Sequence, residues 1–343
     1  MTADLIRAIK SLGLGFEQSR VTDTAGAIAS YRALTSGMGA LLIPLLGVTP
    51  FRVTGQDRLD FLHGQLSNQV KNLPEGGCNE ALLLNAKGHA LAQMTVCRRS
   101  DDVYLAVDEE SGDLVAKHLD DHIIFDQVSL ENVSGSVTTF TLLGSSATEL
   151  IREQVGVVPE EGRFAQYPLQ AGMVLVHPSK RTAWSGFDLH VLTRDAPGLL
   201  HKFVEAGVQP AGESVLEMLR VEAGIPRAER EAGAGVLPQE SGLEGMVSYR
   251  KGCYLGQEIM ARIEARGTVR RSLTGLSLSG WPGPGRHEIS QAGKVVGRVG
   301  TVLEHPELGV VALAVVRCDV ELGSELWVGE SLAKRVELPF LQP

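Results

Sequence analysis

Apolar and polar positions along the chain predict a mixture of strands and helices. Strands are predicted where apolar residues run together or alternate: residues 40–46, 49–57, 123–130, 136–144, 172–178 and 187–193, with three more strands within 80–107. Helices are predicted where apolar residues recur at every third or fourth position: residues 57–70, 110–122, 196–207 and 214–224, with 2–18 and 23–36 helical or mixed. Elements of both kinds without strict alternation are typical of an α+β fold.

The last third of the chain has a different pattern. A predicted strand over 246–251 is followed by a predicted helix over 255–267, in which Leu255, Ile259 and Ile263 share one face. Beyond this helix, short β runs alternate with glycine and proline, and scarcely any helical period remains. This pattern predicts a small C-terminal β-barrel or sandwich.

Composition and charge narrow the class of protein. The 343 residues are 43% hydrophobic and 21% charged, enough for a large core and two or three domains. The net charge of −9 argues against broad binding of nucleic acids, direct contact with tRNA included, because such binding needs a basic surface. No apolar run reaches the roughly 18 residues of a membrane span. The first residues, with Asp4, show no signal or transit pattern, so we expect a soluble cytoplasmic protein.

Common catalytic and metal-binding motifs are missing or weak. The chain has no glycine-rich nucleotide signature, no G-x-S-x-G and no C-x-x-C among its four cysteines. His118 and His122 have the i, i+4 spacing of metal ligands on a helix, but without a third ligand a solvated helix face is the simpler interpretation. Cys97 and Cys318 stand in apolar β runs, where we expect buried thiols, and nothing near Cys78 indicates activation. The sequence therefore predicts no resident metal site.

Cys253 differs from the other cysteines because basic residues and a helix start flank it. It follows Arg250 and Lys251 and precedes the predicted helix, whose first N–H groups favour an anion. Such surroundings favour a thiolate, so Cys253 is a candidate reactive thiol with Lys251 as its charge partner. The alternative is a buried cysteine beside a basic surface helix. Six basic residues against two acidic ones in 250–271 also suggest an anionic ligand.

The segment K-G-C-Y-L-G-Q-E, residues 251–258, resembles the signature of the YgfZ family, folate-binding relatives of the glycine-cleavage T-protein. Further segments resemble motifs of the same superfamily: L-R-V-E-A-G-I-P-R, W-S-G-F-D-L-H-V, L-L-L-N-A-K-G-H and V-T-G-Q-D-R-L-D-F-L-H-G-Q-L-S-N. The resemblance covers roughly residues 40–330. It implies a three-domain, T-protein-like ring around a central channel that accepts tetrahydrofolate, with a C-terminal β-barrel.

The resemblance also implies a division into domains. A discontinuous α+β domain is expected in residues 25–50 and 130–235, and a second α+β domain, 51–129, is expected to be inserted in it. The third domain, 236–343, is expected to hold the signature helix and the barrel.

Candidate site residues follow from the same resemblance. Glu222 is expected to accept hydrogen bonds from a pterin, and a salt bridge with Arg220 or Arg227 is the alternative. The basic segment around Cys253 is expected to receive the glutamate tail of folate. The candidate catalytic residues are Cys253 and Lys251, and the candidate folate ligands are Glu222, Arg227, Tyr254, Gln257, Glu258 and Arg262.

One departure separates the chain from the aminomethyltransferases of this superfamily. Their segment matching A-K-G-H-A-L-A-Q-M carries an aspartate tied to folate chemistry, which is missing here near Ala92 or Gln93. We therefore expect first a tetrahydrofolate-binding accessory protein for assembly or repair of iron-sulfur enzymes. It would carry a cluster only transiently, and its partners would be radical-SAM tRNA-modifying enzymes, which links it indirectly to tRNA methylthiolation. A folate-dependent one-carbon transferase or demethylase, such as an aminomethyltransferase, is the second hypothesis, and a non-catalytic folate-binding module is the third.

Overall fold

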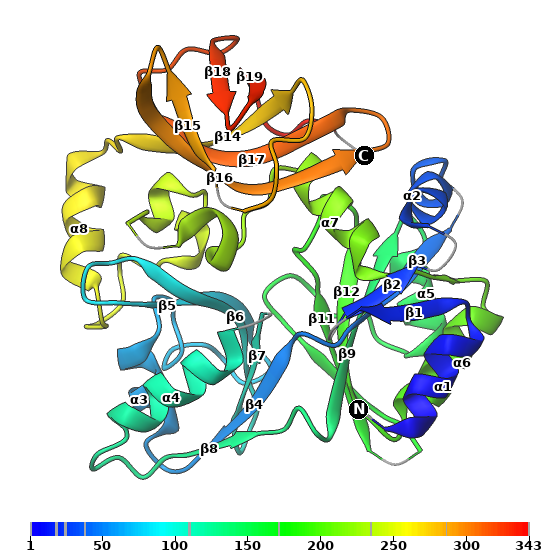
Figure 1. Cartoon of the computed structure of the whole chain (residues 1–343). Helices are drawn as coiled ribbons and strands as arrows, with labels where there is room; N and C mark the ends of the chain where they lie inside the picture. Colours follow the sequence, from blue (N-terminus) through cyan, green and yellow to red (C-terminus); the bar gives the residue numbers. More distant parts are fainter. Residues whose placement is uncertain are drawn as a thin grey trace.

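Three sheets and their helices surround the centre of the molecule (Figure 1). The computed structural model describes residues 2–17, 20–23, 26–37, 39–108, 111–170, 172–233, 235–285 and 287–341. The α-helices are α1 (Ala3–Ser11), α2 (Ala27–Thr35), α3 (Arg58–Gln65), α4 (Gly112–His122), α5 (Ala147–Gln154), α6 (Ala196–Glu205), α7 (Glu213–Glu222) and α8 (Gln257–Arg266). Shorter helical turns follow α7: η2 (Ala228–Ala232), η3 (Pro238–Glu240) and η4 (Glu244–Met246). The α+β class predicted from the sequence is confirmed.

A six-stranded sheet, in the order β10-β11-β12-β9-β3-β13, forms one side of the molecule. Its strands are β3 (Ala40–Leu45), β9 (Val137–Gly144), β10 (Ala165–Pro168), β11 (Met173–Pro178), β12 (Gly186–Leu192) and β13 (Gln209–Pro210), and the hairpin of β1 (Leu14–Glu17) and β2 (Arg20–Asp23) lies apart from it. Every residue of β3 is buried, which its apolar sequence explains. Pro44 is tolerated because its missing N–H faces the side on which β13, paired only with Leu41 and Leu42, has already ended.

A five-stranded sheet, in the order β5-β6-β7-β4-β8, forms the second side. Its strands are β4 (Thr49–Thr54), β5 (Cys78–Leu84), β6 (Ala90–Arg98), β7 (Val103–Val107) and β8 (Ser129–Asn132). Helices α3 and α4 pack on one face, where Leu62 and Leu119 join a core with Phe51, Val96 and Leu105. The opposite face is therefore free to meet the rest of the molecule.

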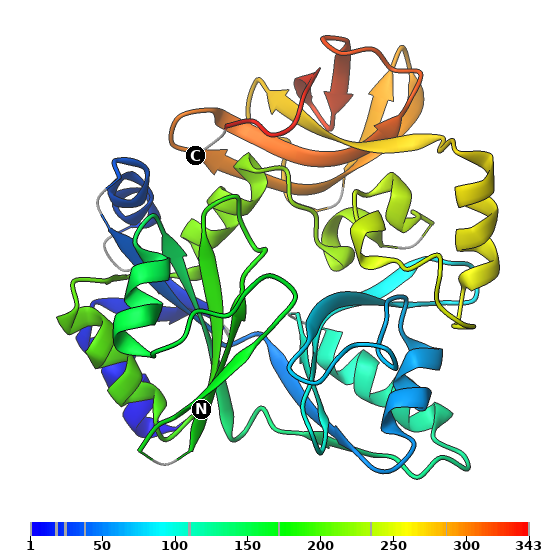
Figure 2. The same ribbon diagram turned by 180° about the vertical axis from the view of Figure 1, so that it is seen from behind.

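The C-terminal strands close into a six-stranded barrel, so the barrel prediction is confirmed. Its strands are β14 (Arg271–Leu278), β15 (Glu288–Gln291), β16 (Lys294–His305), β17 (Gly309–Arg317), β18 (Glu325–Val328) and β19 (Ser331–Val336). Helix α7 leads from the six-stranded sheet to the barrel, where Val221 packs against Val311 and Leu313. Helix α8 connects the barrel with the five-stranded sheet, as both views show (Figures 1 and 2).

Several predicted elements are wrong in extent. The helix predicted over 57–70 stops at Gln65, because Leu66 is extended, although Leu66 and Val70 are buried as their spacing suggested. Only the end of the strand predicted over 123–130 forms, and Phe125 is 96% exposed. The strand predicted over 246–251 is absent: η4 and bends occupy this stretch, which packs through side chains rather than a ladder.

Other expectations lie partly beyond what the structure describes or tests. Gln18 and Glu110, the ends of two predicted helical stretches, lie outside the described residues. The domain limits 25–50 with 130–235, 51–129 and 236–343 stay a prediction. None of the helices in the described part of the chain is long and apolar enough to cross a membrane.

Candidate functional site

A cavity of about 350 Å³ lies where the two open sheets meet the segment that follows α7. Its wall includes Glu80 and Gln93 of the five-stranded sheet, His177 of the six-stranded sheet, and Arg227 and Met246 beyond α7. The size falls within the range of small-molecule sites. We call this space the central cavity.

An ion-pair network crosses the wall of the central cavity. Arg181 donates from Nε to Asp188 and from Nη1 to Asp108, both over 2.8 Å, and all three side chains are largely buried. Burial alone would lower the pKa of Arg181, but the two carboxylates outweigh it and raise that pKa. Burial alone would raise the pKa of Asp188, but Arg181 and several weaker contributions together outweigh burial and lower that pKa. The network therefore keeps the Asp188 carboxylate ionised and places the Asp108 carboxylate on the same guanidinium.

Gln93 stands near the position where the aminomethyltransferase aspartate is missing. Its Nε2 donates to Asp108 over 2.8 Å, and its Oε1 accepts from the backbone N–H of Ala228 over 2.9 Å. Ala92, by contrast, is fully buried in the core of the sheet. A carboxylate is thus present beside Gln93, supplied by the end of the neighbouring strand.

Glu80 adds an acidic group that is not held by a short ion pair. Burial raises its pKa, and the nearest cationic atom recorded, Lys180 Nζ, lies 4.0 Å away and is itself 2.7 Å from Glu161. A carboxyl group in these surroundings can hold a proton at a higher pH than usual.

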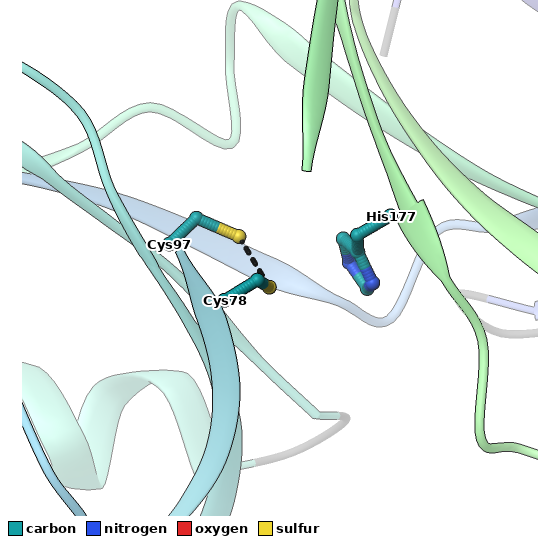
Figure 3. Close-up of side chains that lie close together, drawn as sticks. All are labelled: Cys78, Cys97 and His177. Carbon is teal, nitrogen blue, oxygen red and sulfur yellow. Dashed lines mark hydrogen bonds between the residues drawn. The ribbon is translucent and has the colours of Figure 1, made fainter. Parts of the chain in front are cut away.

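Two thiols and two imidazoles line or adjoin the same wall. Cys78 and Cys97 are buried with their sulfurs 2.8 Å apart, and His177 from the other sheet faces them (Figure 3). Nε2 of His177 lies 3.0 Å from Nε2 of His190. Burial lowers the pKa of both histidines, that of His190 to about 3, so both rings are neutral.

Lys251, predicted as a charge partner of Cys253, donates its ammonium N–H groups to the backbone at the end of α3 and just after it. Its Nζ donates to the carbonyls of His63, Leu66 and Asn68 over 2.5, 2.5 and 2.9 Å. The ammonium also lies 4.8 Å from the centre of the Tyr254 ring. Burial lowers the pKa of Lys251 to about 7, while three carbonyl acceptors favour the ammonium form, because a neutral amine has only two N–H groups.

Cys253 is exposed and is not part of the central cavity wall. Helix α8 begins at Gln257, four residues further on, so the first turn of the helix does not reach the thiol. Gly256 has φ +85°, and a Cβ there would lie 2.8 Å from the Asn85 carbonyl oxygen, which explains the glycine. The role of Cys253 as a reactive thiol stays a prediction.

Glu222 is buried against the barrel rather than at the central cavity. Tyr31 donates its hydroxyl to Glu222 Oε2 over 2.8 Å, and Nε2 of His305 lies 3.1 Å from the same oxygen. Within the described part of the chain, Arg220 pairs with Glu217 and Glu231 and Arg227 with Glu217, and neither pairs with Glu222. Burial, followed by the Glu222 carboxylate, raises the pKa of Tyr31. The pterin role of Glu222 stays a prediction that this position does not favour.

Arg227 is the one predicted folate ligand that lines the central cavity. Its Nη1 lies 3.4 Å from Glu217 Oε2, and Nη2 of Arg220 lies 2.7 Å from Oε1 of the same carboxylate. Burial alone would raise the pKa of Glu217, but the two arginines outweigh it and lower that pKa. Arg227 therefore reaches the cavity from a firmly anchored position.

The remaining predicted ligands belong to the start of α8. Gln257 donates to the Lys251 carbonyl over 3.3 Å, and Glu258 pairs with Arg262 over 2.7 Å on the exposed surface, as their i, i+4 spacing suggested. Burial raises the pKa of the Tyr254 hydroxyl to about 12. The structure groups these residues with Lys251, away from the cavity wall.

The histidine pair of α4 and the two cysteines of the apolar β runs were also assessed from the sequence. His118 and His122 stack with ring centres 4.2 Å apart, and neither belongs to a potential ligand group of three within the described residues. Cys97 is buried as expected, whereas Cys318 is exposed, because it lies just past the end of β17.

Sequence reasoning missed most of the cavity wall. Asp108 follows β7, and Arg181 stands in the turn between β11 and β12, with no motif spacing between them. The sequence did contain a signal for Asp188, because this residue belongs to the segment W-S-G-F-D-L-H-V that resembles a superfamily motif. The fold thus combines two open sheets and a barrel with a cavity lined by charged side chains.

Comparisons with known proteins identify the class of protein. The GCVT N-terminal domain matches residues 27–251. An aminomethyltransferase of Exiguobacterium sibiricum is 31% identical over 84% of this chain and 82% of its own, and one of Halalkalibacterium halodurans is 30% identical over 84% and 83%. The crystal structure of the glycine cleavage system aminomethyltransferase T from Bartonella henselae covers 100% of this chain and 98% of its own, with a TM-score of 0.83 and 18% identity. The chain belongs to the GCVT N-terminal domain family, the T-protein or aminomethyltransferase superfamily.

This membership corrects the leading functional hypothesis. An accessory role in iron-sulfur assembly, with a transient cluster and radical-SAM tRNA-modifying partners, was expected because an aspartate is missing and a cysteine is present. The two relatives described above, each matching 84% of the chain, are instead named aminomethyltransferase, so that hypothesis is wrong. One absent side chain was a weak guide, since the carboxylate of Asp108 stands beside Gln93.

Proposed function

We propose that the chain transfers a one-carbon unit from a small amine to tetrahydrofolate, with the central cavity as its site. The observation that carries this proposal is the meeting of buried carboxylates and guanidinium groups from both open sheets and the segment after α7. Relatives named aminomethyltransferase over more than four fifths of the chain support the reaction class.

The lining fits the chemistry of a folate. A pterin presents N–H and amino donors, for which Asn79 Oδ1 is an acceptor, a buried oxygen with no hydrogen-bond partner in the described structure. Arg163, Lys180 and Arg227 suit the carboxylates of a glutamate tail. In this proposal Arg227 is the one ligand retained from the sequence prediction.

Proton transfer is the chemical task left to the protein. In an aminomethyl donor X–CH2–NH2, two folate nitrogens replace the amine and the group X on the transferred carbon, and the two folate N–H protons leave with the amine and with X. Release of the amine therefore requires its nitrogen to gain a proton. Glu80 is the proposed donor, because burial raises its pKa and it lines the cavity. Arg181 positions Asp108 and Asp188, whose negative charge favours a cationic amine next to the folate.

The finer position of the chain within its superfamily remains a proposal. Residues 251–258 resemble the YgfZ signature, and we infer membership of that group only from this segment. The central cavity lies apart from the segment, so the proposed chemistry does not depend on it.

Anaerobic calorimetry with tetrahydrofolate, followed by a single-turnover assay of one-carbon transfer from an aminomethyl donor, tests the proposal. Wild type should bind tetrahydrofolate and form the methylene product. Asp108→Asn should lower the rate by roughly 10²-fold or more, the scale of losing one electrostatic contact to the transition state. Asp319→Asn, a matched change in an exposed pair with Arg317, should leave the rate unchanged.

The outcomes separate the remaining functions. Absence of both binding and transfer would show the proposal to be wrong. Binding without transfer would favour the non-catalytic folate-binding module, for which the amide of Gln93 in place of an acid is the supporting observation.

A further inference from the structure

Cys78 and Cys97 face each other across β5 and β6 at the closest kind of cross-strand position. They are register partners, and the Cys78 N–H donates away from the ladder to the Gly162 carbonyl, while Arg98 N–H bonds the Gly77 carbonyl. This makes them a non-hydrogen-bonded pair, in which side chains approach most closely. The two sulfurs lie 2.8 Å apart, and both side chains are buried.

His177 brings a third donor from a different sheet. It lies on β11, and one of its ring nitrogens and the two sulfurs are all within 4.8 Å of one another (Figure 3). Two sulfurs and one imidazole form the donor set that zinc prefers over magnesium or calcium. From this convergence we propose that Cys78, Cys97 and His177 bind a zinc ion in the wall of the central cavity.

The charge of the site suits its burial. Binding converts both thiols to thiolates, releasing two protons, and the two negative charges balance Zn²⁺. The neutral imidazole adds none, so the complex has no net charge to bury, unlike an isolated ion.

Metal entry requires a small local change. Two Zn–S bonds of about 2.3 Å at a tetrahedral angle place the sulfurs about 3.8 Å apart, so the thiols must separate by about 1 Å. Cys78 and His177 both line the central cavity, which gives them room to turn. The fourth position would then face the cavity, where water or a substrate atom can bind, as in zinc sites with three protein ligands.

The histidine protonation states are compatible with this binding. The Pro178 carbonyl can only accept, so Nδ1 of His177 carries the proton and donates to it over 2.9 Å, an arrangement that orients many zinc-bound imidazoles. Nε2 of His177 therefore has the lone pair, which now accepts from His190. Zinc takes that lone pair when the His177 ring turns from His190 toward the thiols. His190 can then move its proton to Nδ1, where Thr139 Oγ1 lies 2.9 Å away.

Zinc titration of the full-length, reduced, chelator-treated protein tests the site. Competition with a chromophoric chelator should give one tight site per chain, and Co²⁺ should produce a sulfur-to-metal charge-transfer band. Cys78→Ala and His177→Gln should each weaken binding by more than about 100-fold, beyond the effect of losing an outer-shell partner. Cys318→Ala, which removes an exposed thiol, should bind zinc like wild type.

Three results would overturn the site. The first is a reduced wild type that binds zinc no more tightly than Cys78→Ala. The second is a loss of zinc affinity in Cys318→Ala equal to that in Cys78→Ala. The third is a Cys78–Cys97 disulfide that forms although reductant and zinc are both present. The cobalt spectrum of wild type needs no variant, so a variant that fails to fold does not remove the test. No transfer assay is involved, so this inference and the proposed function can fail separately.

Discussion

The signature turn, residues 251–258, and the central cavity form two contrasting regions. The turn is conspicuous in the sequence, yet its best-defined contacts are structural: Lys251 binds three carbonyls at the end of α3 and just after it, and Gly256 fits against Asn85. The cavity has no contiguous motif, yet it has ion pairs, a carboxyl group whose pKa is raised by burial, and paired thiols. In this molecule a visible motif marks a junction between units, whereas the proposed chemistry lies among dispersed residues.

The contrast has a physical reason. A junction between two units needs several contacts from one short segment, so its residues stay close in sequence. A cavity enclosed by three units takes one or two side chains from each, as Asp108, Arg181 and Arg227 illustrate. Closeness in sequence is therefore no measure of closeness to the site.

The largest effect on the cavity is expected from Arg181→Met. It would leave Asp108 and Asp188 buried without their cation, and breaking a buried ion pair costs about 3–5 kcal/mol of unfolding free energy. Urea unfolding followed by circular dichroism measures the loss, and tetrahydrofolate binding should disappear with it. Arg317→Met, in an exposed pair, is the matched control and should not shift the midpoint. A loss below about 1 kcal/mol for Arg181→Met would contradict the network.

The next effect tests the turn as a structural junction. Lys251→Met keeps much of the buried stem but removes three hydrogen bonds from a charged donor, which should cost about 2–4 kcal/mol. Urea unfolding should show this loss, while one-carbon transfer under folding conditions should change little. An unchanged unfolding midpoint with abolished transfer would contradict this, and would show that the turn acts in the reaction rather than as a structural junction.

The sequence predicted the framework better than the site. Strands such as β3 and β9 were found because buried apolar runs leave a direct pattern, and the glycine-rich C-terminal third indicated the barrel. The strand over 246–251 was wrong because its alternating apolar residues pack against other units instead of a neighbouring strand. Cys78, Cys97 and His177 could not be grouped, because only the packing of two sheets brings His177 to the thiols.

A pH-dependent effect should come from Glu80. Burial raises its pKa in the folded chain, so between the ordinary pKa of glutamate and the folded value the folded state binds more protons than the unfolded state. Stability therefore falls as pH rises through that window. Glu80→Gln should remove this part of the fall, seen by comparing urea midpoints of variant and wild type from about pH 4 to 7. Glu325→Gln, on the exposed surface, should follow wild type, and parallel curves for Glu80→Gln would contradict the burial effect.

The smallest effect is expected from Cys253→Ser, the residue that the sequence made most conspicuous. Its side chain is exposed and outside the cavity wall, so the unfolding free energy should change by less than about 0.5 kcal/mol. Cys97→Ser is the same substitution at a buried cysteine. It places a hydroxyl at a fully buried position, so the unfolding free energy should fall by about 1–3 kcal/mol. One-carbon transfer should also survive Cys253→Ser. A loss of transfer greater than about tenfold, with an unchanged unfolding midpoint, would show that Cys253 takes part in the reaction, because unfolding could not then explain the lost activity.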